Sequence, residues 1–201
     1  MHINELRDLD TVAVRTTIAL VSQVIPADLV KPTPCAAWTV YGLISHMAAQ
    51  HRGFAASSTG DGGLDHWKLV SLGDDPAATY RSAAEAALTA FAVDDLADRK
   101  FPLPEFGAEA VVPGQQALSF HLVDYVVHAW DLASALGLSV TFPPEVLAAA
   151  LTVARSVPDG EFRLAPGAAF APAVPEPGDE GLDDIVALLG RSPAWPAAVA
   201  A

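Results

Sequence analysis

The chain has 201 residues, of which 52% are hydrophobic and 17% charged, so it is long and apolar enough to fold as one globular domain with extensions. Its 24 acidic and 11 basic residues give a formal net charge of -13, and the basic residues form no cluster along the chain. A surface of this sign repels phosphate backbones and anionic lipids, which argues against nucleic acid and membranes as partners. The charged start, MHINELRDLD, does not resemble a secretory signal, so we expect a cytoplasmic protein.

Four long segments predict helices. Residues 4–24 place most of their apolar side chains on one side, and Pro26 follows. The second helix follows Thr39, a suitable N-cap, and the third opens with Asp75 as cap and Pro76 at its first position. The fourth runs from about 115 to 136 and stops at Gly137.

Shorter elements surround these helices. Residues 64–73 predict a short helix or turn, and a proline-punctuated connection, 101–116, precedes the fourth helix. Beyond it we expect a fifth helix within 143–156, a Pro/Gly-rich arm over 157–181 and a last short helix over 182–190. Strand signals are weak throughout. The prediction is an all-α fold: a four-helix bundle over residues 1–137 and a C-terminal extension over 138–201 that packs on it.

A stripe of four polar residues interrupts the fourth helix, which is otherwise apolar almost all the way round. His121, Asp124, His128 and Asp131 fall within an arc of roughly 80 degrees at helical spacing. One interpretation is a face turned to water. A solvated face usually draws on Lys, Glu, Gln and Arg, however, whereas Asp and His are poor helix formers. The choice of residues therefore favours chemistry at this stripe.

Asp124 and His128 are four residues apart, so both side chains can reach one small object. A carboxylate oxygen and an imidazole nitrogen are both ligands of divalent cations, and a third ligand must come from another segment. His46 is the best candidate because it lies among apolar neighbours in the second helix. The alternative is that His46 is a hydrogen-bonded core residue with no metal.

Three blocks of sequence carry a family resemblance: PTPCAAWTVYGLISHMAA (32–49), DYVVHAWDLASALG (124–137) and LDDIVALLGRSPAW (182–195). Together they resemble the DinB-like proteins related to the metal-binding domain of mycothiol-dependent maleylpyruvate isomerase. The matched patterns are Thr-Pro-Cys-x-x-Trp before a helix with one histidine, (Asp/Glu)-x-x-x-His-x-Trp-Asp, and Gly-Arg-x-Pro-x-Trp near the end.

The resemblance implies an up-down-down-up bundle in which His46, Asp124 and His128 hold a metal. Two departures from the family pattern stand out. Asp124 replaces a longer Glu, so His121 could substitute for it or support the ligands from behind. Gly42 replaces an acidic residue common in relatives, so no capping box forms at the second helix. The isomerase also has a larger C-terminal domain that helps to bind substrate, so its reaction does not transfer directly.

Other residues have open roles. Cys35 is either a nucleophile or, as the resemblance favours, part of the turn that enters the second helix. Asp131 would accept a hydrogen bond from the second ring nitrogen of His128, or have a solvent or capping role. Arg191 would bind an anionic group of a cofactor, or anchor the tail through an ion pair. The remaining histidines have no supporting pattern, and we expect them on the surface or in loops: His2, His51 and His66.

Three protein ligands leave coordination positions open, as in catalytic metal sites. The family resemblance then implies a thiol-dependent transferase or isomerase that uses mycothiol or a similar low-molecular-weight thiol, with an electrophile as second substrate. Zinc is the first choice of metal, and iron, nickel and manganese fit the same ligands. The alternative is a non-enzymatic bundle that binds a metal or small ligand, such as a stress-response or sensor protein. Whether the bundle forms a homodimer is left open.

Overall fold

A computed structural model describes residues 1–35, 38–107, 109–165, 168–175, 177–178 and 180–196. Parts of the predicted Pro/Gly-rich arm and the last five residues therefore lie outside the described residues. The α-helices are α1 (Ile3–Val21), α2 (Val40–Ser57), α3 (Pro76–Phe91), α4 (Gly114–Leu136), α5 (Pro144–Ser156) and α6 (Leu182–Leu188). None of the described helices is long and apolar enough to span a membrane.

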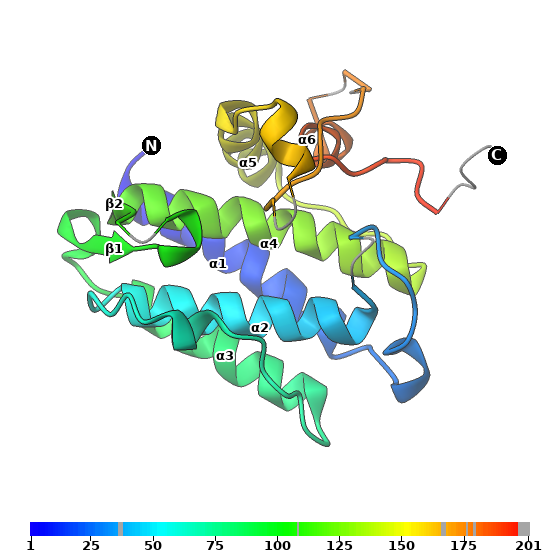
Figure 1. Ribbon diagram of the computed structural model, residues 1–201, viewed down its shortest axis with the longest axis horizontal. Helices are drawn as coiled ribbons and strands as arrows, with labels where there is room; N and C mark the ends of the chain where they lie inside the picture. The colour runs from blue at the N-terminus through cyan, green and yellow to red at the C-terminus, as the bar shows by residue number, and fades with distance from the viewer. Residues whose placement is uncertain (36–37, 108, 166–167, 176, 179, 197–201) are drawn as a thin grey trace.

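The first four helices form a bundle, which confirms the predicted fold class. In Figure 1, α1 and α4 run in one direction and α2 and α3 in the other, the up-down-down-up arrangement. The parallel pair α2 and α3 is joined by a long crossover, which contains the short 3-10 helix Leu64–Trp67. Helix α2 contacts both α3 and α4, and α1 contacts both α4 and α3. The two neighbours α2 and α4 carry the predicted metal ligands.

The helix ends follow from local side chains. Thr39 caps α2 by accepting a hydrogen bond from the Gly42 amide, and Asp75 caps α3 by accepting one from the Ala78 amide. Helix α4 stops at Gly137, whose left-handed backbone (φ +71°) suits glycine. The expected starts of α2 and α3 and the expected end of α4 are confirmed.

A small sheet, which the sequence did not predict, precedes α4. Strands β1 (Lys100–Pro102) and β2 (Val111–Pro113) pair antiparallel, with Phe101 opposite Val112. Each strand is three residues long and contains a proline, so the usual alternation of polar and apolar residues is too short to recognise. Phe101 is fully buried against the bundle. Packing of this side chain, rather than strand propensity, therefore holds the connection in place.

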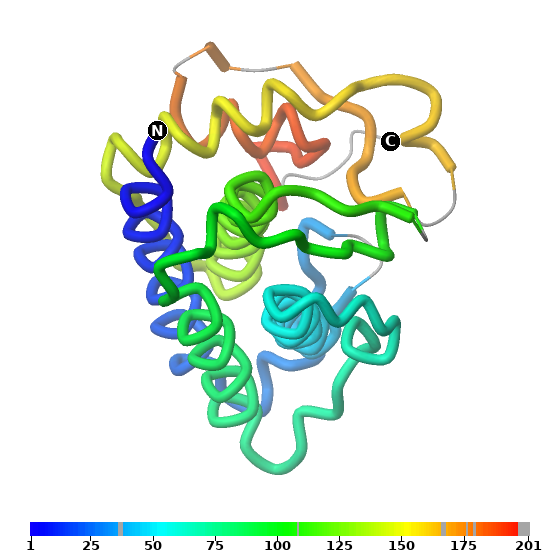
Figure 2. The backbone as a smooth tube through the Cα atoms, turned by 90° about the vertical axis from the view of Figure 1, so that its left-hand side faces the viewer, coloured from blue at the N-terminus to red at the C-terminus, as the bar shows by residue number. Residues whose placement is uncertain are grey.

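Helices α5 and α6 pack on one another and on α4 (Figure 1), and Figure 2 shows both helices on one side of the bundle. The buried guanidinium of Arg163 holds the C-terminal segment together, because it donates to four backbone carbonyls, those of Val157, Pro158, Ala171 and Leu188. A division into two domains at Gly137 stays a prediction.

Gly114, the first residue of α4, lies against the 3-10 helix Leu96–Asp98 that precedes the small sheet, and a substitution there tests how closely the two are packed. The carbonyl oxygen of Leu96 occupies the place that a Cβ atom at Gly114 would take. We expect Gly114→Ala to lower the free energy of unfolding by about 1–3 kcal/mol, because a rigid backbone atom must move. Urea denaturation measures the change. The exposed Gln116→Ala, two residues along the same helix, should stay within about 0.5 kcal/mol of the wild type; an equal loss in both variants would refute the packing argument.

Candidate metal centre

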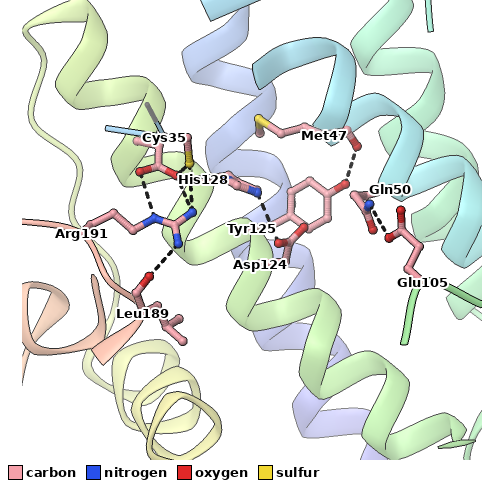
Figure 3. A network of polar contacts seen from close by, with 10 residues as sticks. Cys35, Met47, Gln50, Glu105, Asp124, Tyr125, His128, Leu189 and Arg191 are labelled. Atoms are coloured by element: carbon pink, nitrogen blue, oxygen red, sulfur yellow. Dashed lines mark hydrogen bonds and ion pairs between the residues drawn. The ribbon is translucent and has the colours of Figure 1, made fainter. Parts of the chain in front are cut away.

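Helices α2 and α4 bring His46, Asp124 and His128 together. One ligand atom of each residue lies within 4.8 Å of the other two. The His46 and His128 rings meet nearly edge to face, with centroids 5.3 Å apart, and Nε2 of His128 is 3.3 Å from Oδ1 of Asp124. Figure 3 shows His128 and Asp124 pointing toward one another from α4.

The donor set fits a divalent cation. Two imidazole nitrogens and one carboxylate oxygen are the ligands that zinc and similar metals take in sites with open positions. The second carboxylate oxygen of Asp124, Oδ2, is buried without a hydrogen-bond partner. A buried carboxylate oxygen without a partner is costly, and a cation would satisfy it.

Trp38 forms a wall of the site. Its ring stacks on His46 with centroids 4.2 Å apart, and lies 6.2 Å from the His128 ring. This aromatic surface limits the rotation of His46 and shields one face of the ring from water. The matched sequence block thus supplies a wall residue together with a proposed ligand.

Asp131 orients His128 from behind. Nδ1 of His128 donates to Oδ2 of Asp131 over 2.9 Å, which directs the other nitrogen, Nε2, toward Asp124 and His46. Asp131 is fully buried. Of the two roles left open for Asp131, the structure thus shows the hydrogen bond to His128 and not exposure to solvent.

Arg191 compensates the buried charge of Asp131. Its Nη2 lies 3.2 Å from Oδ2 of Asp131 and 3.0 Å from Sγ of Cys35, and its Nη1 donates to the Leu189 carbonyl (Figure 3). The side chain is only 7% exposed. The structure therefore shows the ion pair that anchors the tail. An anion-binding role for Arg191 stays a prediction.

Cys35, His128 and Asp131 form a second group whose atoms are close enough to hold a metal. Sγ of Cys35 lies 3.2 Å from Oδ2 of Asp131, and the Arg191 guanidinium contacts both residues. A cation there would lie beside a fixed positive charge, so this group does not fit a metal. Cys35 instead belongs to the cluster that supports His128.

The charges of the three ligands are set by burial and by one another. Burial, and next the charge of His128, lower the pKa of His46 to about 4. Burial also disfavours charge on His128, but the charge and hydrogen bond of Asp124 and the hydrogen bond of Asp131 outweigh it and raise the pKa of His128 well above its usual value. Burial raises the pKa of Asp124, yet His128 outweighs this effect and lowers it to about 2. Without metal, His46 is therefore neutral at pH 7, His128 protonated and Asp124 ionised.

His121 does not reach the other ligands, although it lies on the same stripe. Its Nδ1 is 2.7 Å from Oδ1 of Asp10 on α1, and its Nε2 is 3.1 Å from Nδ1 of His51 on α2. The expectation that His51 lies at the surface is wrong: its side chain is completely buried. His2 is exposed and His66 is partly exposed in the crossover between α2 and α3, in agreement with the expected surface or loop positions.

Asp10 belongs with His121 and His51 to a buried cluster, and its role was not predicted from the sequence. It is fully buried on α1, between Leu6 and Val14 at steps of four. An aspartate in the apolar stripe of a helix was the available signal, because a buried carboxylate needs a partner on another segment.

The comparisons with known proteins bear on this site. The family model for the mycothiol maleylpyruvate isomerase N-terminal domain matches residues 11–133, a range that includes all three proposed ligands. Uncharacterized proteins from two strains of Mycobacterium tuberculosis are 32% identical over 181 residues, which cover 87% of this chain and 91% of theirs.

Two solved structures share the fold. They are crystal structures of the mycothiol-dependent maleylpyruvate isomerase and of a mutant of it, with TM-scores of 0.55 and 0.58 and identities of 18% and 17%. Each match covers 75% of this chain and 68% of that chain.

Metal uptake should release about one proton per cation at pH 7. The proton comes from Nε2 of His128, because His46 is already neutral and Asp124 already ionised. The apparent affinity for Zn²⁺ should therefore rise about tenfold per pH unit between about pH 4 and the raised pKa of His128, because one proton competes with the cation in that range. Below about pH 4, His46 adds a second competing proton. Calorimetry of Zn²⁺ binding in buffers of different ionisation enthalpy measures the count; release of about two protons at pH 7 would contradict the assigned charges.

Proposed function

The chain belongs to the mycothiol maleylpyruvate isomerase N-terminal domain family, and we propose that it is a metal-dependent transferase or isomerase that uses a low-molecular-weight thiol. His46, Asp124 and His128 would hold the divalent cation, with zinc as the first choice. The observation that carries the proposal is the convergence of these three donors within 4.8 Å, with one buried carboxylate oxygen of Asp124 left without a partner.

A cation bound there would lower the pKa of a coordinated thiol and so supply thiolate near neutral pH. The protein side chains prepare the site for this chemistry. His46 is kept neutral by burial and Trp38 stacks on its ring. Asp131 accepts a hydrogen bond from Nδ1–H of His128, so that Nε2 is the nitrogen that faces the other ligands.

The substrates follow from this chemistry. A thiol such as mycothiol would be the first, as the printed names of the related isomerase structures suggest. The second would be a compound with an electrophilic carbon that a thiolate can attack. The net charge of -13 makes a polyanionic partner unfavourable.

A binding protein without turnover is the alternative function. Two side chains beside His128 that could act on a substrate, Cys35 and Arg191, are both engaged with Asp131. This arrangement favours a site that holds a cation and leaves few free groups for chemistry.

Turnover by metal-loaded protein separates the two functions. Protein purified without a polyhistidine tag and loaded with one equivalent of Zn²⁺ should, with mycothiol present, turn over at least one of a panel of electrophiles that includes maleylpyruvate. A transferase would consume the thiol in this reaction, whereas an isomerase would regenerate it. We expect His128→Ala to lose bound zinc and to reduce the rate to that of the uncatalysed reaction, because one ligand and its orienting contact disappear.

His66→Ala, at a partly exposed histidine outside the site, is the matched control and should retain zinc and rate. Full activity after exhaustive chelation would refute the metal-thiolate mechanism. Stoichiometric zinc with no turnover of any electrophile would support the binding protein instead.

A further inference from the structure

A chain of hydrogen bonds crosses the buried centre of the bundle, apart from the proposed metal ligands. It runs from Asp10 to His121 (2.7 Å), from His121 to His51 (3.1 Å), from His51 to Tyr80 (3.2 Å) and from Tyr80 to Thr17 (2.6 Å). All five side chains are completely buried. Each of the four bundle helices contributes at least one of them, so the chain joins all four.

The donor and acceptor of each hydrogen bond can be assigned by starting from Thr17. Thr17 donates to the Val14 carbonyl, which can only accept, so the Tyr80 hydroxyl donates to Thr17. Nε2 of His51 must then donate to Tyr80, and Nδ1 of His51 accepts from Nε2 of His121. The neutral form of His51 agrees with its pKa, which burial and then the charge of His121 hold well below the usual value.

The direction of these hydrogen bonds also sets the combined charge of Asp10 and His121. Nδ1 of His121 faces Oδ1 of Asp10, and one proton lies between them, on either the ring or the carboxyl group. The pair is therefore neutral as a whole, although each member is a titratable group. This pairing satisfies Oδ1 of Asp10, whereas Oδ2 of the same carboxyl group is buried without a hydrogen-bond partner among the described residues.

The contact between His51 and His121 lies next to the metal centre. His51 is five residues beyond His46 on α2, and His121 is three residues before Asp124 on α4, or about 7.5 and 4.5 Å along their helices. Tyr125 adds a second link between the same helices. Its ring stacks on His51 with centroids 3.9 Å apart, and its hydroxyl donates to the carbonyl of Met47, the neighbour of His46 (Figure 3).

We propose that His51 and His121 are positioning residues of the metal centre. Their hydrogen bond holds α2 and α4 at the spacing at which His46 meets Asp124 and His128. Apolar contacts between two helices permit small slides, whereas a buried hydrogen-bonded chain is satisfied in only one arrangement. Metal–nitrogen bonds of about 2.1 Å tolerate errors of only about 0.2 Å, so the ligands need such a restraint. The inference rests on the proposed function, because it requires a cation at His46, Asp124 and His128.

The test compares two variants that cut the same chain at different places. His121→Phe removes the link between α2 and α4, whereas Tyr80→Phe removes only the link to α3 and α1 and leaves the His51–His121 contact in place. Co²⁺ is the probe, because its visible absorption reports the geometry of its ligands as well as its occupancy. Urea denaturation of the metal-free proteins gives the stability of each variant.

We expect His121→Phe to weaken Co²⁺ binding about tenfold or more and to change the shape of the absorption band. Tyr80→Phe should destabilise the fold, because it leaves Nε2 of His51 unpaired, yet keep the wild-type affinity within about twofold and the wild-type spectrum. His51→Gln tests the α2–α4 link independently, and we expect it to lose the same Co²⁺ affinity. It takes the place of His121→Phe if that variant does not fold.

Two outcomes would overturn the inference while the proposed function stands. One is a wild-type affinity and spectrum in both link variants, His121→Phe and His51→Gln. The other is an equal loss of affinity in Tyr80→Phe, which would show that general stability, and not the α2–α4 link, controls binding. A wild-type protein that binds no Co²⁺ would overturn the proposed function together with the inference.

Discussion

The polar stripe of α4 is the constraint on which the rest of the structure depends. His121, His128 and Asp131 are buried in the middle of the protein, and Asp124 is largely so. A buried charged or polar group is costly unless it is paired. Two residues of the stripe, His121 and Asp131, therefore dictate which other segments must lie beside α4.

The partners differ from one end of the stripe to the other. His121 requires Asp10 on α1 and His51 on α2. Asp131 requires Arg191, more than fifty residues further along the chain, so the C-terminal segment becomes part of the support for His128. Within the stripe, Asp124 retains a buried oxygen without a partner, which is the observation behind the proposed cation.

Arg191 shows how a tail residue can control a site in the bundle. It lies beyond the range that the family model matches, yet it compensates the charge of Asp131 and contacts Cys35 at the entry to α2. Breaking a buried ion pair of this kind typically costs about 3–5 kcal/mol, because the remaining charge is left uncompensated. The orientation of His128 thus depends on a segment outside the bundle.

Local patterns determined the helices, their caps and the candidate ligands. Asp124 and His128 were identified by a spacing that a single helix enforces, and His46 by an imidazole in an apolar helix together with the family resemblance. The β1–β2 sheet, the burial of His51 and the pairing of His121 with Asp10 were decided only by tertiary structure. His51 was wrongly expected at the surface for the same reason: a buried histidine needs partners for its ring nitrogens, and those of His51 come from other helices, His121 on α4 and Tyr80 on α3. Such partners are distant in sequence, and only the packing of four helices brings them within hydrogen-bonding distance.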